Sequence, residues 1–314
     1  MSWTKKKNNN IVRLTLENRY ETHSLIHSGA YAKVYAGIDT QLQRKAAIKQ
    51  LLLPRVSAKS LFRFWSACHA MLECNTQTAA QLYDFFIVDE QPYIISQWIE
   101  AVSLAELMKS NRLLTMRVVQ KISFTLAQYL AAIHTKGYMH LNLNPDNIFP
   151  DKTGAVTVTD MGVARIVSDT GITVTGMFNE KAMMYLAPEQ WMYDTISSAC
   201  DVFAFGVILY RLVTGAMPFP AQSVQNYLSA IAQRRLAAVR PALLNPHVPA
   251  YLDKLISQCL SIHPAERPAD GNAVLAALHS QEETVYIESV PPPLPTLVLP
   301  FIKQSRSKTT RRSR

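Results

Sequence analysis

The hydrophobic pattern changes once along the chain, near residue 100. Residues 20–98 form short β-rich runs, and the runs 81–88 and 92–99 flank a polar turn, which predicts a hairpin. Between these runs, residues 60–72 contain spaced apolar side chains without Gly or Pro, which favours a helix. Apolar residues then recur at helical spacing in 103–110, 116–137, 201–214, 221–237, 249–262 and 271–280. The sequence therefore predicts an α+β protein with a small β-rich lobe followed by a larger helical lobe.

The positive charge of the chain lies at its two ends. The net charge is +9, from 32 Lys+Arg and 23 Asp+Glu. Residues 1–10 hold three lysines and residues 303–314 hold six basic residues, and neither stretch contains an acid. The body between them is neutral, so the sequence gives nucleic acid little to bind except a possible contact with the basic tail. We expect a basic and polar arm at 1–18, lobes at 19–98 and 99–280, and a tail at 281–314.

The tail is proline-rich and then basic. Pro291, Pro292, Pro293 and Pro295 favour polyproline II, and the Ser, Thr and Arg residues that follow cannot bury apolar area. A flexible tail is the simplest interpretation. A polyproline ligand for an aromatic-lined groove, or a basic arm for nucleic acid or anionic lipid, are the alternatives.

The four cysteines are dispersed and contain no C-x-x-C pair, which favours a reduced, cytoplasmic compartment. The apolar run 202–213 is interrupted by Arg211 and is too short to span a bilayer, and the residues after the basic N-terminus are too polar for a signal peptide. We therefore expect a cytoplasmic protein without a membrane span.

Six short motifs follow one another along the two predicted lobes, after a segment at 26–35 that keeps a single glycine, Gly29. Each motif alone has an ordinary structural interpretation, but their order and separations together do not. They are Ala46-Ala47-Ile48-Lys49, residues 140–149, residues 156–162, Ala187-Pro188-Glu189, residues 201–206 and residues 263–268.

These motifs resemble the eukaryotic-like Ser/Thr protein kinase family, in the style of its bacterial members, over about residues 19–280. The resemblance implies a bilobal fold that binds ATP and Mg²⁺. It implies Lys49 as the lysine that pairs the α/β-phosphates, and Asn147 and Asp160 as the metal ligands. It further implies a nucleotide pocket made by Gly29, Val34, Ala47, Ser96 in the gatekeeper place, Gln97, Trp98 and Phe149. Glu189, Arg267 and Asp201 match structural positions of the family.

The chain departs from the family where the phosphoryl acceptor would be activated. Asn142 stands in place of the catalytic aspartate, and an amide cannot accept a proton. Asn144 replaces the lysine two residues later, and Ala182 replaces the threonine that would bond to both. We interpret the three changes as one concerted loss.

Other departures surround the lysine and the activation segment. The helix glutamate that would pair with Lys49 is Ala67, and the nearest acid, Glu73, is about a turn and a half away, so Lys49 is expected to contact Asp160 or a phosphate directly. Leu141 replaces the arginine that receives an activation-loop phosphate in the family. Phosphorylation at Ser168, Thr170, Thr173 or Thr175 would therefore lack its usual receptor.

The sequence thus predicts a pseudokinase that keeps weak ATP and Mg²⁺ binding and acts as a regulatory or scaffold protein with an unidentified protein partner. The first alternative is an active serine/threonine kinase that transfers the ATP γ-phosphate to protein Ser/Thr. The second is a scaffold that binds no nucleotide.

Overall fold

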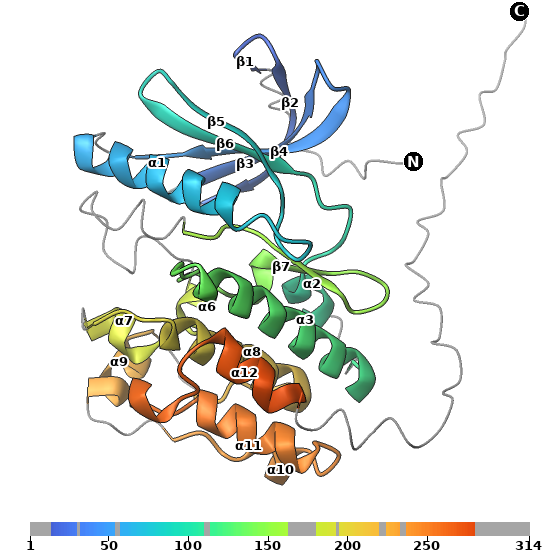
Figure 1. Cartoon of the computed structure of the whole chain (residues 1–314), viewed down its shortest axis with the longest axis vertical. Helices are drawn as coiled ribbons and strands as arrows, with labels where there is room; N and C mark the ends of the chain where they lie inside the picture. The colour runs from blue at the N-terminus through green and yellow to red at the C-terminus, as the bar shows by residue number, and fades with distance from the viewer. Residues whose placement is uncertain are drawn as a thin grey trace, which may run out of the picture.

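The computed structural model describes residues 14–29, 32–53, 57–109, 114–162, 180–192, 195–219, 224–232 and 237–279. Figure 1 shows a β-rich N-terminal lobe with one long helix above a larger helical lobe, as the sequence predicts. The predicted phosphorylation positions at 168–175 and the tail from 281 lie outside the described residues.

A six-stranded sheet with the order β1-β2-β3-β4-β6-β5 forms the N-terminal lobe, and all neighbouring strands are antiparallel. The β5–β6 connection confirms the predicted hairpin, because Asp89 and Glu90 both have positive φ, the geometry of a tight two-residue turn. The sheet begins four residues before the expected lobe boundary at 19, because buried Leu16 joins its core. The strands are β1 (Thr15–Leu16), β2 (Tyr20–Ser28), β3 (Ala32–Asp39), β4 (Arg44–Leu51), β5 (Leu82–Val88) and β6 (Gln91–Gln97).

Helix α1 (Ala58–Glu73) is the single long helix described in this lobe. It begins at Ser57, whose hydroxyl accepts the Ser60 backbone N–H at 3.1 Å, while the Ser60 hydroxyl accepts the Ser57 N–H at 2.8 Å. Phe64, Ala67 and Cys68 are buried on the inner side of α1, in one apolar cluster with Leu51 and Ile94 of the sheet. The helix is thereby held against β5 and lies above the boundary between the lobes (Figure 1).

The helical lobe is organised around α8, which is buried on nearly all sides and contacts α3, α10 and α11. Such all-round burial explains why its sequence is apolar without a polar face. Helix α3 packs along α12, and the short β7–β8 hairpin lies between the lobes. The elements are α2 (Leu104–Lys109), α3 (Met116–Thr135), η1 (Pro145–Asn147), β7 (Ile148–Pro150), β8 (Val156–Val158), α6 (Glu180–Met183), α7 (Pro188–Met192), α8 (Ala199–Thr214), α9 (Val224–Ala232), α10 (Pro241–Leu244), α11 (Ala250–Cys259), η2 (Pro264–Glu266) and α12 (Gly271–His279).

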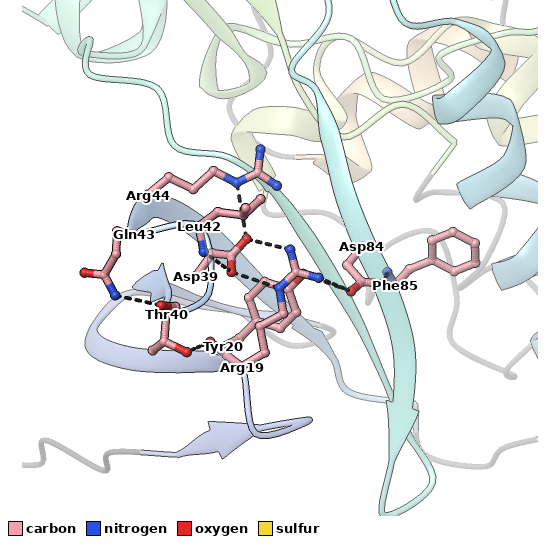
Figure 2. Close-up of polar contacts among 9 residues, drawn as sticks. All are labelled: Arg19, Tyr20, Asp39, Thr40, Leu42, Gln43, Arg44, Asp84 and Phe85. Carbon is pink, nitrogen blue, oxygen red and sulfur yellow. Dashed lines mark hydrogen bonds and ion pairs between the residues drawn. The ribbon is translucent and has the colours of Figure 1, made fainter.

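At one end of the sheet, the buried Asp39 carboxylate connects the end of β3 to residues at the start of β2 and β4 (Figure 2). Asp39, at the end of β3, is fully buried and accepts two hydrogen bonds of 2.8 Å from the Arg19 guanidinium and one of 3.3 Å from Arg44 Nε. Nearby, the hydroxyl of buried Tyr20 donates to Asp84 on β5 at 2.8 Å. Hydrogen bonding from Arg19 lowers the pKa of Asp39 to about 2.

The charge of Asp39 makes the stability of this lobe pH-dependent. Because the pKa of Asp39 is depressed in the folded state, its stabilising contribution is fully present above about pH 4 and is lost as the pH falls toward 2. We expect Asp39→Asn to lower the free energy of unfolding by about 1–3 kcal/mol at pH 7. In urea titrations the difference from wild type should shrink between pH 4 and pH 2. Glu100→Gln, which removes an exposed carboxylate that pairs with Lys45, should leave the pH profile unchanged, and a constant Asp39→Asn difference across this range would contradict the assignment.

Candidate functional site

Lys49 and Asp160 form a direct ion pair between the two lobes. Lys49 lies on β4 opposite Val34 of β3 and Ile94 of β6, whereas Asp160 follows β8 in the helical lobe. The lysine side chain is 13% exposed and the aspartate side chain 25% exposed, so the pair is mostly shielded from water. This contact is the one expected for a lysine without an acidic partner on the helix.

Helix α1 offers Lys49 no carboxylate. Ala67 occupies the position expected for the helix glutamate, and it lies against the turn after Asp160, since a Cβ atom on Gly162 would be 3.4 Å from the Ala67 Cβ. Glu73 is the single acid of α1. Its carboxylate accepts the Tyr138 hydroxyl at 2.7 Å, and its backbone carbonyl accepts Lys136 Nζ. The end of α1 is therefore attached to the helical lobe and not to Lys49.

Asp201 of α8 holds the loop 140–147 in place. Its buried carboxylate accepts the backbone N–H groups of His140 at 2.7 Å and Leu141 at 2.8 Å. It also accepts His134 Nε2–H at 3.0 Å, because His134 Nδ1 is already the acceptor for the Gly271 N–H. Leu141 has φ +61°, a conformation that a branched side chain rarely adopts, and these contacts hold it there.

Asn142 and Asn144 bond to each other within this loop. Asn144 Nδ2 donates to the Asn142 carbonyl at 2.9 Å and to Asn142 Oδ1 at 3.0 Å, and Asn144 Oδ1 accepts the Asp146 N–H at 3.0 Å. Both side chains are buried. The Asn144 amide therefore caps the η1 turn, with both of its polar atoms used inside the loop.

Asn147 and Asp160 are brought to the same place by backbone and side-chain contacts. Asn147 Nδ2 donates to the Asn142 carbonyl at 2.9 Å, and the Asn147 carbonyl accepts the Thr159 N–H at 3.0 Å, one residue before Asp160. An amide oxygen and a carboxylate are hard donors that suit Mg²⁺, which usually takes one or two protein ligands together with phosphate oxygens and water. The donor set fits the metal, although Lys49 already contacts Asp160 Oδ2.

Ala182 of α6 has no side-chain hydroxyl to offer the loop 140–147. It is buried with Met183 and Leu186 in the apolar cluster that includes Phe64 and Ala67 of α1. Met161, beside Gly162, is buried in the core of the helical lobe.

The predicted nucleotide-pocket residues divide between the strands and the helical lobe. Ala47 is the cross-strand partner of Ser96, and Val34 is the partner of Lys49, so these four lie on adjacent strands of one sheet. The remaining residues are placed separately. Gly29 donates its N–H to the Ala32 carbonyl at 2.9 Å, Gln97 ends β6, Trp98 follows it partly buried, and Phe149 lies on β7.

Comparison with known proteins decides the family. The protein kinase domain model matches residues 20–280. The chain belongs to the protein kinase family. It is 31% identical over 284 residues to the serine/threonine-protein kinase PknL of Mycobacterium tuberculosis, covering 89% of this chain and 70% of that protein.

Two further kinases match over a smaller share of their own length. A probable serine/threonine-protein kinase of Clostridium acetobutylicum is 28% identical over 269 residues, which are 85% of this chain and 40% of the relative. The serine/threonine-protein kinase PrkC of Bacillus subtilis is 28% identical over 255 residues, 80% of this chain and 39% of the relative. The chain thus spans less than half the length of these two kinases.

A buried ion pair braces the helical lobe of this kinase domain. Arg267 donates to Glu189 at 2.6 Å and 3.0 Å, and its other donors reach the carbonyls of Ser261, Ala199 and Ile262. The Cys200 thiol donates to Glu189 Oε1 at 3.2 Å; burial, reinforced by Glu189, raises the pKa of this thiol, which keeps it protonated.

A small cavity behind Ser96 includes residues that the kinase motifs did not indicate. Its volume is about 30 Å³, and Ser96 and Asp160 line it together with Met71, Cys74 and Tyr129. These last three belong to α1, its C-cap and α3, where their apolar character marks them only as core. No motif could have separated them from other buried residues.

In the part of the chain that the structure describes, no helix combines the length and apolar character needed to cross a bilayer.

Proposed function

We propose that this member of the protein kinase family binds ATP with Mg²⁺ weakly and transfers phosphate poorly or not at all, so that it works as a regulatory or scaffold protein. Residues 19–98 and 99–280 would be its two lobes, and the nucleotide would lie between them. The four cysteines are free and buried, which supports a reducing, cytoplasmic location.

Lys49, Asn147 and Asp160 support nucleotide binding. Lys49 would neutralise phosphate charge from β4, and Asn147 and Asp160 would hold the metal from below. Mg²⁺ would supply charge neutralisation to the phosphates when bound. Ala47, Val34, Ser96, Gln97, Trp98, Phe149 and Gly29 would surround the base and the phosphates.

The Asn142–Asn144 contact carries the proposal of impaired phosphotransfer. The Asn142 amide cannot take the proton of an attacking hydroxyl, and general-base help of this kind is worth roughly 10²–10⁴ in rate, about 3–5 kcal/mol of barrier. Asn144 carries no charge and its amide is used inside the loop, so it cannot steady a transferring phosphoryl group. Ala182 has no hydroxyl to connect them. The aspartate, lysine and threonine that the family uses together for phosphotransfer are therefore all absent.

An active serine/threonine kinase is the second candidate, and the comparisons favour it at least as well. PknL and PrkC are both named serine/threonine-protein kinases. Labelled ATP decides between the candidates, since incorporation into protein that is abolished by Lys49→Ala would establish the active kinase.

Nucleotide binding is tested by thermal unfolding of the whole chain with ATP, with and without Mg²⁺. A ligand at 100 times its Kd stabilises by about 2.7 kcal/mol, which is a rise in Tm of several degrees for a chain of this size. Asp160→Ala should remove the Mg²⁺-dependent part of the shift. Asp151→Ala, in an exposed turn, should keep it. A wild-type protein that does not respond to ATP would contradict the proposal and favour the scaffold without nucleotide.

Phosphotransfer is tested by restoring one member of the lost unit. We expect Asn142→Asp to raise phosphate incorporation by less than about tenfold, because Asn144 and Ala182 remain and general-base help alone is only part of the barrier. The measurement is incorporation from labelled ATP, with Asn142→Asp combined with Lys49→Ala as the control. Robust autophosphorylation by the single variant would show that the loss is not concerted.

A further inference from the structure

The outer face of α1 carries an exposed apolar stripe. Phe62, Trp65, His69 and Leu72 are spaced by three, four and three residues, so they lie along one side of the helix. Phe62 is 71% exposed, Trp65 42% and Leu72 47%, and His69 is also exposed. The inner face of the same helix is already buried against the sheet. The residues of the stripe are therefore not used to pack α1 against the sheet.

Aromatic rings dominate this surface, and Phe85 contacts those of Trp65 and His69. Phe85 of β5 stands beside the helix, with its ring centroid 5.0 Å from that of Trp65 and 6.0 Å from that of His69, both edge to face. Buried Phe64 supports them from beneath, 6.1 Å from Phe85 and 5.8 Å from Trp65. We call Phe62, Trp65, His69 and Phe85 the aromatic surface. Rigid aromatic rings beside one another are the surface that polyproline segments recognise.

The chain itself contains a segment of the matching chemistry. Between Glu288 and Lys303 there is no charged residue, and this stretch holds five prolines with Leu294, Leu297, Val298, Leu299 and Phe301. A purely solvated tail has few such apolar residues, because they gain nothing in water. The composition favours a partner surface that is apolar and aromatic.

The length of the tail allows this contact within one molecule. Pro291 and Phe301 lie 12 and 22 residues beyond His279, where α12 ends, so an extended chain carries them up to about 40 Å and about 70 Å from that point. A domain of about 260 residues has a radius of gyration near 18 Å, so the reach of the segment is comparable to the width of the domain. A tethered segment also needs less contact area than a free partner, because its effective concentration is high. The stripe alone is small for a stable dimer, which buries about 800 Å² on each partner.

We propose that the proline-rich segment 289–302 of this chain docks on the aromatic surface formed by α1 and β5. Prolines pack on the rings of Phe62, Trp65 and Phe85, and the aliphatic residues that follow cover the stripe toward Leu72. Two other groups of exposed large apolar side chains lie close in sequence in the described residues: Leu25 and Ile26 on β2, and Val239, Leu243 and Leu244 at α10. Both groups are purely aliphatic and offer no ring to a proline. This inference does not depend on nucleotide binding.

Photo-crosslinking in the whole chain tests the contact. Leu297 is replaced by benzoyl-phenylalanine, the protein is irradiated, and the crosslinked peptides are identified by mass spectrometry. We expect crosslinks to residues 58–73 and 82–88, in a yield that stays constant on tenfold dilution because the reaction is intramolecular. Crosslinks mainly to 237–244, crosslinks that join two chains, or no crosslink to the body would each overturn the proposal.

Surface variants identify the rings that bind the segment. Phe62→Ser should lower the yield of α1 crosslinks at least fivefold, and His69→Ser provides a second variant if Phe62→Ser unfolds. Leu243→Ser is the matched control, since Leu243 is 73% exposed and equally apolar. Unchanged Tm values show that the variants are folded. If the yield of crosslinks to α1 were unchanged in both Phe62→Ser and His69→Ser, the assignment to the aromatic surface would be overturned.

Discussion

Replacing Glu189 by alanine should lower the free energy of unfolding by about 3–5 kcal/mol, because it leaves the Arg267 guanidinium buried without a counter-charge. Arg267 has no exposed side-chain surface, so water cannot take over the role of the carboxylate. The lost pair also connects α7 to the segment after η2, 78 residues away in sequence. At about 2–4 °C per kcal/mol, Tm should fall by roughly 6–20 °C.

The control for this prediction is an ion pair of the same charges in water. Lys109 and Glu106 pair on α2 with both side chains more than half exposed. Glu106→Ala should change stability by less than about 0.5 kcal/mol. Urea unfolding of the three proteins measures the difference, and equal losses for Glu189→Ala and Glu106→Ala would show that burial of Arg267 does not govern the effect.

Asp201→Ala should be the second severe change, lowering the free energy of unfolding by about 3–6 kcal/mol. The change leaves three buried donors without an acceptor: the backbone N–H groups of His140 and Leu141 and the Nε2–H of His134. Each unsatisfied donor costs about 1–3 kcal/mol. The strained φ of Leu141 also loses its restraint. Asp201→Asn keeps the shape of the side chain and one acceptor oxygen, so it should lower the free energy of unfolding by about half as much. Denaturant titration measures both losses.

Asp151 is a matched control, because its carboxylate also accepts three hydrogen bonds, from Thr153 N, Thr153 Oγ1 and Ala155 N. Its turn is exposed, so water replaces those bonds and Asp151→Ala should cost about 1 kcal/mol or less. If Asp151→Ala and Asp201→Ala were equally destabilising, the number of hydrogen bonds and not their burial would set the loss.

The long elements of the fold were predictable because they bury one regular face. The period of apolar residues indicated α3, α8, α11 and α12, and the polar turn at 89–91 indicated the β5–β6 hairpin. The short elements β1, α6 and α10 were not predicted, since two to four residues carry too little periodicity. Their positions depend on contacts with distant residues, as the burial of Leu16 in the sheet core illustrates.

The candidate site was predictable where motif spacing carries the information. The absence of an acid near Ala67 predicted that Lys49 contacts either Asp160 or a phosphate, and the structure has the contact with Asp160. The closed contact between Asn142 and Asn144 was not foreseen, because it depends on side-chain torsions and on the φ of a neighbouring residue. The hydrogen bond between Glu73 and Tyr138 could not be predicted either, because the two residues are 65 positions apart and belong to no shared motif.

The Lys49–Asp160 pair has a consequence for affinity. Because α1 supplies no acid, Asp160 acts as a competing ligand that the protein carries within its own site. An anion that needs Lys49 binds only the fraction of molecules in which the pair is open, and its apparent Kd equals the intrinsic value divided by that fraction. A glutamate on α1 would give Lys49 a partner other than Asp160, the metal ligand that we propose. The weak nucleotide binding that we propose would therefore follow from a single carboxylate missing from α1.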